Sequence, residues 1–118
     1  MKKQEILNAI ESRKARSTWS KALKLYAYEL IEDVEQDEIT LEDLNNGLLL
    51  NGAKDWKEFS YGGCSLVYDY DIAQRVCTPS EFKRTKEGNN NPNSKENWLD
   101  VQTRALRQAY AIIKYYVR

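Results

Sequence analysis

The sequence predicts an all-α protein, a compact single-domain bundle of five or six helices spanning residues 1–118. Apolar residues recur at intervals of three or four through most of the chain, which places one apolar stripe on each helix. Capping residues mark several helix starts, and Gly or Pro marks several ends. With 118 residues and 42% hydrophobic content, the chain is long enough to bury one core.

The first expected helix covers residues 2–14, where Ile6 and Ile10 belong to a short apolar stripe. Ser17 or Thr18 can cap a second helix, because both hydroxyls can accept a bond from a free backbone N–H. The pattern leaves open whether the two helices join near Ser17. The apolar stripe of the second helix comprises Trp19, Leu23, Tyr26, Ala27, Leu30, Ile31 and Val34.

Thr40 and Asp43 have the spacing of an N-cap and an acidic residue three positions later, which predicts a third helix. Leu41 and Leu44 are then expected to face the core, and Asn51-Gly52 to end the helix.

Residues 52–69 give weaker signals. A short helical turn is expected around Trp56, and the apolar run that follows Cys64 favours strand, so the bundle has room for one short extended segment there.

Asp71 and Gln74 have capping-box spacing for a short helix that ends at Val76. The run Thr78-Pro79-Ser80-Glu81 then predicts a new helix start, with Thr78 as the cap and Pro79 in the first helical position. An Asn-rich loop follows. The last helix has its apolar side at Trp98, Gln102, Ala105, Leu106, Ala109, Ile112, Ile113 and Tyr116.

The absence of histidine excludes several classes of enzyme. Neither a Ser-His nor a Cys-His nucleophile pair can form, and no His-based zinc site can form. Two cysteines cannot complete a thiolate zinc site, and no glycine pattern fits a phosphate loop. We therefore expect a non-enzymatic protein without a cofactor or a metal site.

Charge is segregated along a chain of zero net charge. Residues 1–27 carry seven Lys or Arg against two Glu, and residues 28–80 carry three against twelve Asp or Glu. Residues 81–118 are basic again, with eight against four. Either the faces neutralise each other within the molecule, or each face meets its own partner. A homodimer that pairs the faces is a further alternative.

The hypothesis is a module that binds a protein partner. One candidate surface is the tyrosine- and aspartate-rich segment around residues 61–71, because exposed aromatic residues beside polar ones suit interfaces. Its candidate residues are Tyr61, Tyr68, Asp69, Tyr70, Asp71 and Arg75. The other candidate is the stretch 29–43, which contains eight Asp or Glu and no Lys or Arg.

Two alternatives involve nucleic acid. Basic residues of the terminal helices could contact phosphates. The candidates are Lys83, Arg84, Lys86, Arg104 and Arg107. In the opposite alternative, the acidic stretch mimics nucleic-acid charge and inhibits a host defence protein. A pI near 6.3 argues against a dedicated DNA-binding protein.

Residues 56–105 resemble an uncharacterised family of small proteins from mobile genetic elements of Gram-positive gut bacteria. The resemblance is carried by Gly62-Gly63-Cys64, by the run from Tyr68 to Arg75, by Cys77-Thr78-Pro79-Ser80-Glu81, and by Trp98 to Ala105. It implies a bacterial accessory role and assigns no catalytic residue. The N-terminus has no apolar run after its charges, and no segment is long enough to span a bilayer, so we expect a cytoplasmic protein and no membrane partner.

Overall fold

The computed structural model describes residues 2–50, 70–88 and 98–117, without the side chains of residues 48–50, 84–88 and 98–100. These residues form six helices and no strand, which confirms the all-α prediction. The helices are α1 (Lys3–Glu11), α2 (Thr18–Glu32), α3 (Leu41–Leu50), α5 (Tyr70–Val76), α6 (Pro79–Gly88) and α7 (Trp98–Tyr116). One isolated antiparallel bridge joins Lys2 and Glu38. The expected helical turn at Trp56 and the extended segment near Cys64 lie outside the described residues.

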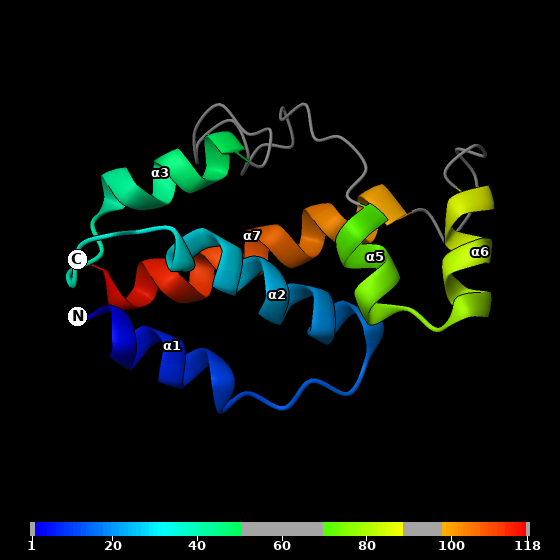
Figure 1. The fold of residues 1–118 in the computed structure, drawn as a ribbon, viewed down its shortest axis with the longest axis horizontal. Coiled ribbons are helices and arrows are strands. Elements are labelled where there is room, and N and C mark those ends of the chain that lie inside the picture. Colours follow the sequence, from blue (N-terminus) through cyan, green and yellow to red (C-terminus); the bar gives the residue numbers. More distant parts are fainter. Residues whose placement is uncertain (1, 51–69, 89–97, 118) are drawn as a thin grey trace.

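Helix α2 is the centre of the bundle. It packs most extensively against α7, and it also contacts α1, α3 and α5 (Figure 1). Both chain termini lie at the end of the molecule where α2 finishes and α3 begins, whereas α5 and α6 lie at the opposite end (Figure 1). The two ends of α2 therefore have different neighbours.

The core is one cluster of buried side chains to which every helix except α6 contributes fully buried residues. Its largest members, each less than 2% exposed, are Tyr26, Tyr110, Ile6, Ile10, Leu30, Ile31, Leu44, Ile72 and Leu106. Helix α6 adds the partly buried Phe82 at the edge of this cluster. Among the described side chains, most residues of the expected stripes of α1, α2 and α7 are buried, because residues three and four apart lie on one side of a helix. Trp19, Ile112 and Tyr116 are half-buried, and the side chain of Trp98 is outside the described set.

Three predicted helix starts are confirmed. The Ser17 hydroxyl accepts a bond from the backbone N–H of Ser20, so α1 and α2 are separate helices. Thr40 and Asp43 bond reciprocally at the start of α3. Thr78 and Glu81 do the same at the start of α6, with Pro79 in its first position.

Two local predictions are wrong. Leu41 was expected in the core, but it is 43% exposed because it is the first residue of α3 and lies before the turn that meets α2. Asp71 was expected to cap α5, but this helix already includes Tyr70, so Asp71 lies in its first turn. A carboxylate there still faces the positive end of the helix dipole.

Helices α1 and α2 cap each other through lysines. Lys3 on α1 donates from Nζ to the carbonyl oxygens of Glu32 (2.8 Å) and Val34 (2.6 Å) at the end of α2. Lys24 on α2 donates from Nζ to the carbonyl of Glu11 (3.1 Å) at the end of α1. Each ammonium thus satisfies carbonyls that have no partner within their own helix and meets the negative end of a helix dipole.

Candidate interaction surface

An acidic hollow lies between the C-terminal end of α2 and the first turns of α3. Its volume is about 270 Å³, and the residues that line it are Glu29, Leu30, Asp33, Val34, Glu35, Gln36, Asp43, Asn46 and Gly47. Four of these side chains carry carboxylates. The stretch 29–43, one of the two surfaces that the sequence suggested, therefore folds around a concave site.

Local hydrogen bonds hold the α3 side of the hollow. One Asp43 oxygen accepts from the backbone N–H and the hydroxyl of Thr40, at 2.8 and 3.0 Å. The other oxygen accepts from the Gln36 side-chain amide at 3.1 Å. Asp43 is therefore a structural carboxylate, whereas the side chains of Asp33 and Glu35 make no hydrogen bond or ion pair within the described part of the chain.

Gly47 sets how closely α3 approaches α2. A Cβ added at this position would lie 3.0 Å from Leu30 Cδ2 and 3.4 Å from the Leu30 carbonyl oxygen. Leu30 is only 2% exposed, so it has little room to move away. The absence of a side chain at Gly47 thus lets α3 lie close to α2 at Leu30.

The side-chain charges of α2 add to its dipole instead of opposing it. The N-terminus of a helix favours acids and the C-terminus favours bases. Helix α2 has no acid in its first turn and no base in its last turn. It carries Lys21 and Lys24 near its start, with Glu29 and Glu32 near its end. The negative potential of the hollow therefore has two sources, the carboxylates that line it and the negative end of the α2 dipole.

Lys3 supplies a compensating cation at this end of α2. Its Nζ lies on the backbone carbonyls of Glu32 and Val34, so its charge acts on the helix end itself. The carboxylates of the hollow do not form a group that could hold a metal ion, nor does any other set of three metal-binding side chains among the described residues.

Of the tyrosine- and aspartate-rich candidate surface, the structure describes the residues that belong to α5. Tyr70 is half-buried and packs edge-on against Phe82 of α6, with ring centroids 6.3 Å apart and planes at 88°. Asp71 and Arg75 are exposed on the same helix. Tyr61, Tyr68 and Asp69 lie outside the described residues. Tyr70 thus joins α5 to α6, and the two charged residues remain on the surface.

The basic candidates are spread over two helices. Lys83 is exposed on α6, Arg104 is exposed on α7, and Arg107 on α7 is half-buried. The side chains of Arg84 and Lys86 are outside the described set.

Several residues that shape these sites carry no distinguishing signal in the sequence. Lys3 was one of many N-terminal cations, and only the long-range contact with the end of α2 distinguishes it. Gly47 had no turn or motif around it, because its role depends on a neighbouring helix. Trp19 was expected to be a plain core residue, but it is half-buried and lines a second cavity.

Comparisons of this chain with protein-family models, with curated proteins and with solved structures found no match. Among the described helices, none is long and apolar enough to cross a membrane.

Proposed function

We propose that this protein is a non-enzymatic interaction module, and that its acidic hollow takes a basic segment of a protein partner. A Lys or Arg side chain is the group that this site suits, because it offers positive charge together with an apolar stem. The stem can lie along Leu30 and Val34 while the charged head meets the carboxylates. The family resemblance of residues 56–105 adds that the module serves a bacterial mobile element.

The proposal rests on the unbonded carboxylates of Asp33 and Glu35. Both line the hollow, and neither side chain is bonded within the described residues. The negative end of α2 lies beside them, and it raises the affinity of this region for cations. Complementary charge of this kind increases association rates and selects partners of one sign.

The alignment of charge with the α2 dipole supports the same proposal. Acids at a helix C-terminus oppose stability by a few tenths of a kcal/mol each, up to about 1 kcal/mol. A sequence selected for stability alone would place bases there. Protein sites that serve function commonly retain arrangements that reduce stability.

The first test uses a fluorescent ten-residue peptide rich in Lys and Arg, titrated with the full chain and followed by anisotropy. The test variant is the double substitution Asp33→Asn/Glu35→Gln. The matched control is Glu32→Gln/Glu42→Gln, which removes the same charge from the same stretch but from residues that do not line the hollow. We expect the test variant to lose about tenfold or more in affinity, and the control about twofold.

Equal losses in the two variants would show that net charge, and not the hollow, holds the peptide. The natural partner is then sought by affinity capture from a nuclease-treated bacterial lysate, with the same two variants. Capture that the hollow variant loses and the control keeps would support the proposal. If DNA or RNA displaces that partner, the hollow acts as a mimic of nucleic-acid charge.

A further inference from the structure

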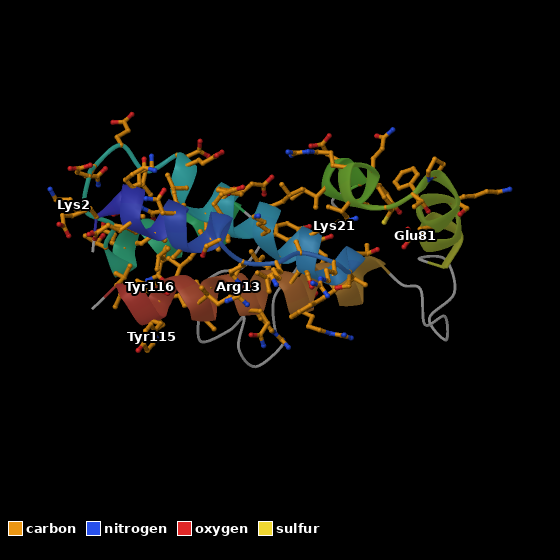
Figure 2. The ribbon with its side chains drawn as sticks, turned by 90° about the horizontal axis from the view of Figure 1, so that it is seen from below. Lys2, Arg13, Lys21, Glu81, Tyr115 and Tyr116 are labelled. Carbon is orange, nitrogen blue, oxygen red and sulfur yellow. The ribbon has the colours of Figure 1, made fainter. Side chains whose placement is uncertain are left out.

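The connection between α1 and α2 and the first turn of α2 carry four cations without partners. Arg13, Lys14 and Arg16 are exposed on the connection, and Lys21 is exposed on α2 itself. Figure 2 labels two of these residues, Arg13 and Lys21. None of these four side chains makes a hydrogen bond or an ion pair in the described structure. We call these four residues the basic cluster.

The acids near the basic cluster are already engaged. Glu11 pairs with Lys24 at 3.7 Å and accepts a bond from the Tyr28 hydroxyl. Glu81 of α6 accepts from the Thr18 hydroxyl at 2.9 Å and from the backbone N–H of Thr78 at 3.0 Å. These carboxylates therefore leave the charge of the basic cluster uncompensated.

A small cavity opens beside the basic cluster. Its volume is about 30 Å³, and it is lined by Arg13, Lys14, Ala15, Trp19, Ser20, Leu23 and Lys24. A space of this size can hold a water molecule or an oxygen atom of a ligand. Three of the residues that line it, Arg13, Lys14 and Lys24, are cationic.

Trp19 is one of the residues that line this cavity, and its side chain holds a donor without an acceptor. Its indole Nε1 is buried and has no hydrogen-bond acceptor in the described structure. A buried donor without an acceptor costs about 1–3 kcal/mol, and native proteins leave few of them. Because the same side chain lines the cavity, an oxygen that enters there is the natural candidate for the missing acceptor.

We infer that the basic cluster and the Trp19 cavity form a binding site for a phosphate group. One phosphate oxygen enters the cavity and accepts from Trp19 Nε1, and the outer oxygens meet the guanidinium and ammonium groups of the cluster. The positive end of α2 adds to the attraction. This site is independent of the acidic hollow and shares no residue with it.

Phosphate fits these observations better than carboxylate. A phosphate monoester carries close to two negative charges and three strong acceptor oxygens, whereas a carboxylate carries one charge and two oxygens. A nucleic-acid phosphodiester carries one charge and two free oxygens, but it repeats along the strand and so can meet several cations. Two of the four unpaired cations, Arg13 and Lys14, line the cavity together with Trp19, so a group with several oxygens can meet these cations and the indole donor at once. The phosphate belongs either to a small molecule or to the backbone of a nucleic acid.

The test is ¹⁵N NMR of the full chain, which contains three tryptophans. The substitution Trp19→Phe assigns the Trp19 indole signal by its loss. Inorganic phosphate is then titrated against sodium chloride of equal ionic strength. We expect a saturable downfield shift of the Trp19 Nε1–H signal with phosphate and no such shift with chloride.

Substitutions distinguish phosphate binding at this site from a general effect of the positive charge of the protein. Arg13→Gln/Lys14→Gln/Arg16→Gln removes three exposed cations, and we expect it to weaken phosphate binding about tenfold or more. Trp19→Phe keeps an aromatic ring and removes the donor, with an expected loss of about fivefold, measured from the backbone amide signals because the indole signal is absent. The matched control is Lys2→Gln/Lys83→Gln/Arg104→Gln, which removes three exposed cations elsewhere and should leave binding within twofold.

A second arm identifies the source of the phosphate, using a single-stranded oligonucleotide and a mononucleotide. Tighter oligonucleotide binding with a steep salt dependence supports a nucleic-acid backbone. Equal binding of the mononucleotide supports a small ligand. The inference is overturned if no probe gives a saturable shift at Trp19, if polyglutamate shifts it as strongly as phosphate, or if the control variant loses as much affinity as the cluster variant. The variant Arg13→Gln/Lys14→Gln/Arg16→Gln still tests the phosphate site if Trp19→Phe fails to fold.

Discussion

The two ends of α2 carry opposite charge, and they differ in the contacts that they make with neighbouring helices. At the acidic end, neighbouring elements bind the helix closely: Lys3 caps its carbonyls and Gly47 lets α3 approach. The two neighbours α7 and α3 are themselves joined by a bond from Tyr110 to Asn45 at 3.3 Å. At the basic end, one hydrogen bond between Thr18 and Glu81 links α2 to α6, while a buried donor and a small cavity remain unfilled.

This difference shows how a small bundle can carry strong charge without neutralising it internally. Helix α2 has 15 residues and is about 22 Å long, so its two charged ends lie more than two Debye lengths apart at physiological salt. The ends cannot neutralise each other over that distance. The acidic end is stabilised by packing and by one lysine, and the basic end is left with unsatisfied groups that a ligand can complete.

The largest expected effect comes from breaking the packing at the acidic end. Leu30→Ala removes a side chain that is 2% exposed and lies against Gly47, and we expect the free energy of unfolding to fall by about 2–4 kcal/mol. Urea denaturation of the purified chain measures it. The control is Leu25→Ala, which truncates a half-buried residue of the same helix and should cost clearly less.

If Leu25→Ala and Leu30→Ala cost the same, the acidic end is no better packed than the rest of α2. The comparison between the two ends would then rest on charge alone.

The next largest expected effect is the loss of stability when the Lys3 cap of α2 is removed. Lys3→Ala removes the ammonium that bonds to the carbonyls of Glu32 and Val34, and we expect a loss of about 1–2 kcal/mol. Lys2→Ala is the control, because Lys2 has the same charge and is exposed without a side-chain contact. A loss in Lys3→Ala that the control matches would show that only the net charge of the N-terminus matters.

Periodicity predicted most of the fold. The stripes of α1, α2 and α7, and the capping pairs at Thr40–Asp43 and Thr78–Glu81, depend on residues a few positions apart, so the sequence reveals them directly. Leu41 was misplaced because periodicity does not say where along a helix the neighbouring helix begins to make contact.

The candidate sites were only partly predictable. The acidic stretch 29–43 was visible as composition, but its hollow depends on α3 lying against Leu30, and no local pattern encodes that approach. The role of Lys3 and the unsatisfied Trp19 donor arise from contacts between distant segments. The interpretation that opposite charges neutralise one another was left open by the sequence, and the length of α2 argues against it for its two ends.

A smaller expected effect on stability depends on pH and concerns the hydrogen bond between Tyr110 of α7 and Asn45 of α3. Burial raises the pKa of Tyr110 above its ordinary value of 10.0. The unfolded chain therefore releases the Tyr110 proton first, so the contribution of this group to stability is complete below pH 10 and is lost as pH rises through the folded-state pKa.

Tyr110→Phe should remove that alkaline component and lower stability near neutral pH by about 0.5–1.5 kcal/mol, because Asn45 loses its hydrogen-bond donor. Thermal unfolding from pH 7 to 11 measures both changes. Tyr115→Phe is the control, since Tyr115 is 69% exposed and lies at the end of the same helix. An unchanged pH profile in Tyr110→Phe would contradict the assignment.

The smallest expected effect has the opposite sign. Lys21→Glu places an acid near the start of α2, where the helix dipole favours it, and removes the like-charge neighbour of Lys24 three positions away. We expect the protein to become more stable by about 0.3–0.5 kcal/mol, while phosphate binding at the Trp19 cavity weakens. Gain of stability and loss of binding in one variant would show that the basic end is arranged for a ligand. If Lys21→Glu instead destabilises the fold, the charge at this end has a structural partner, and the contrast between the two ends of α2 disappears.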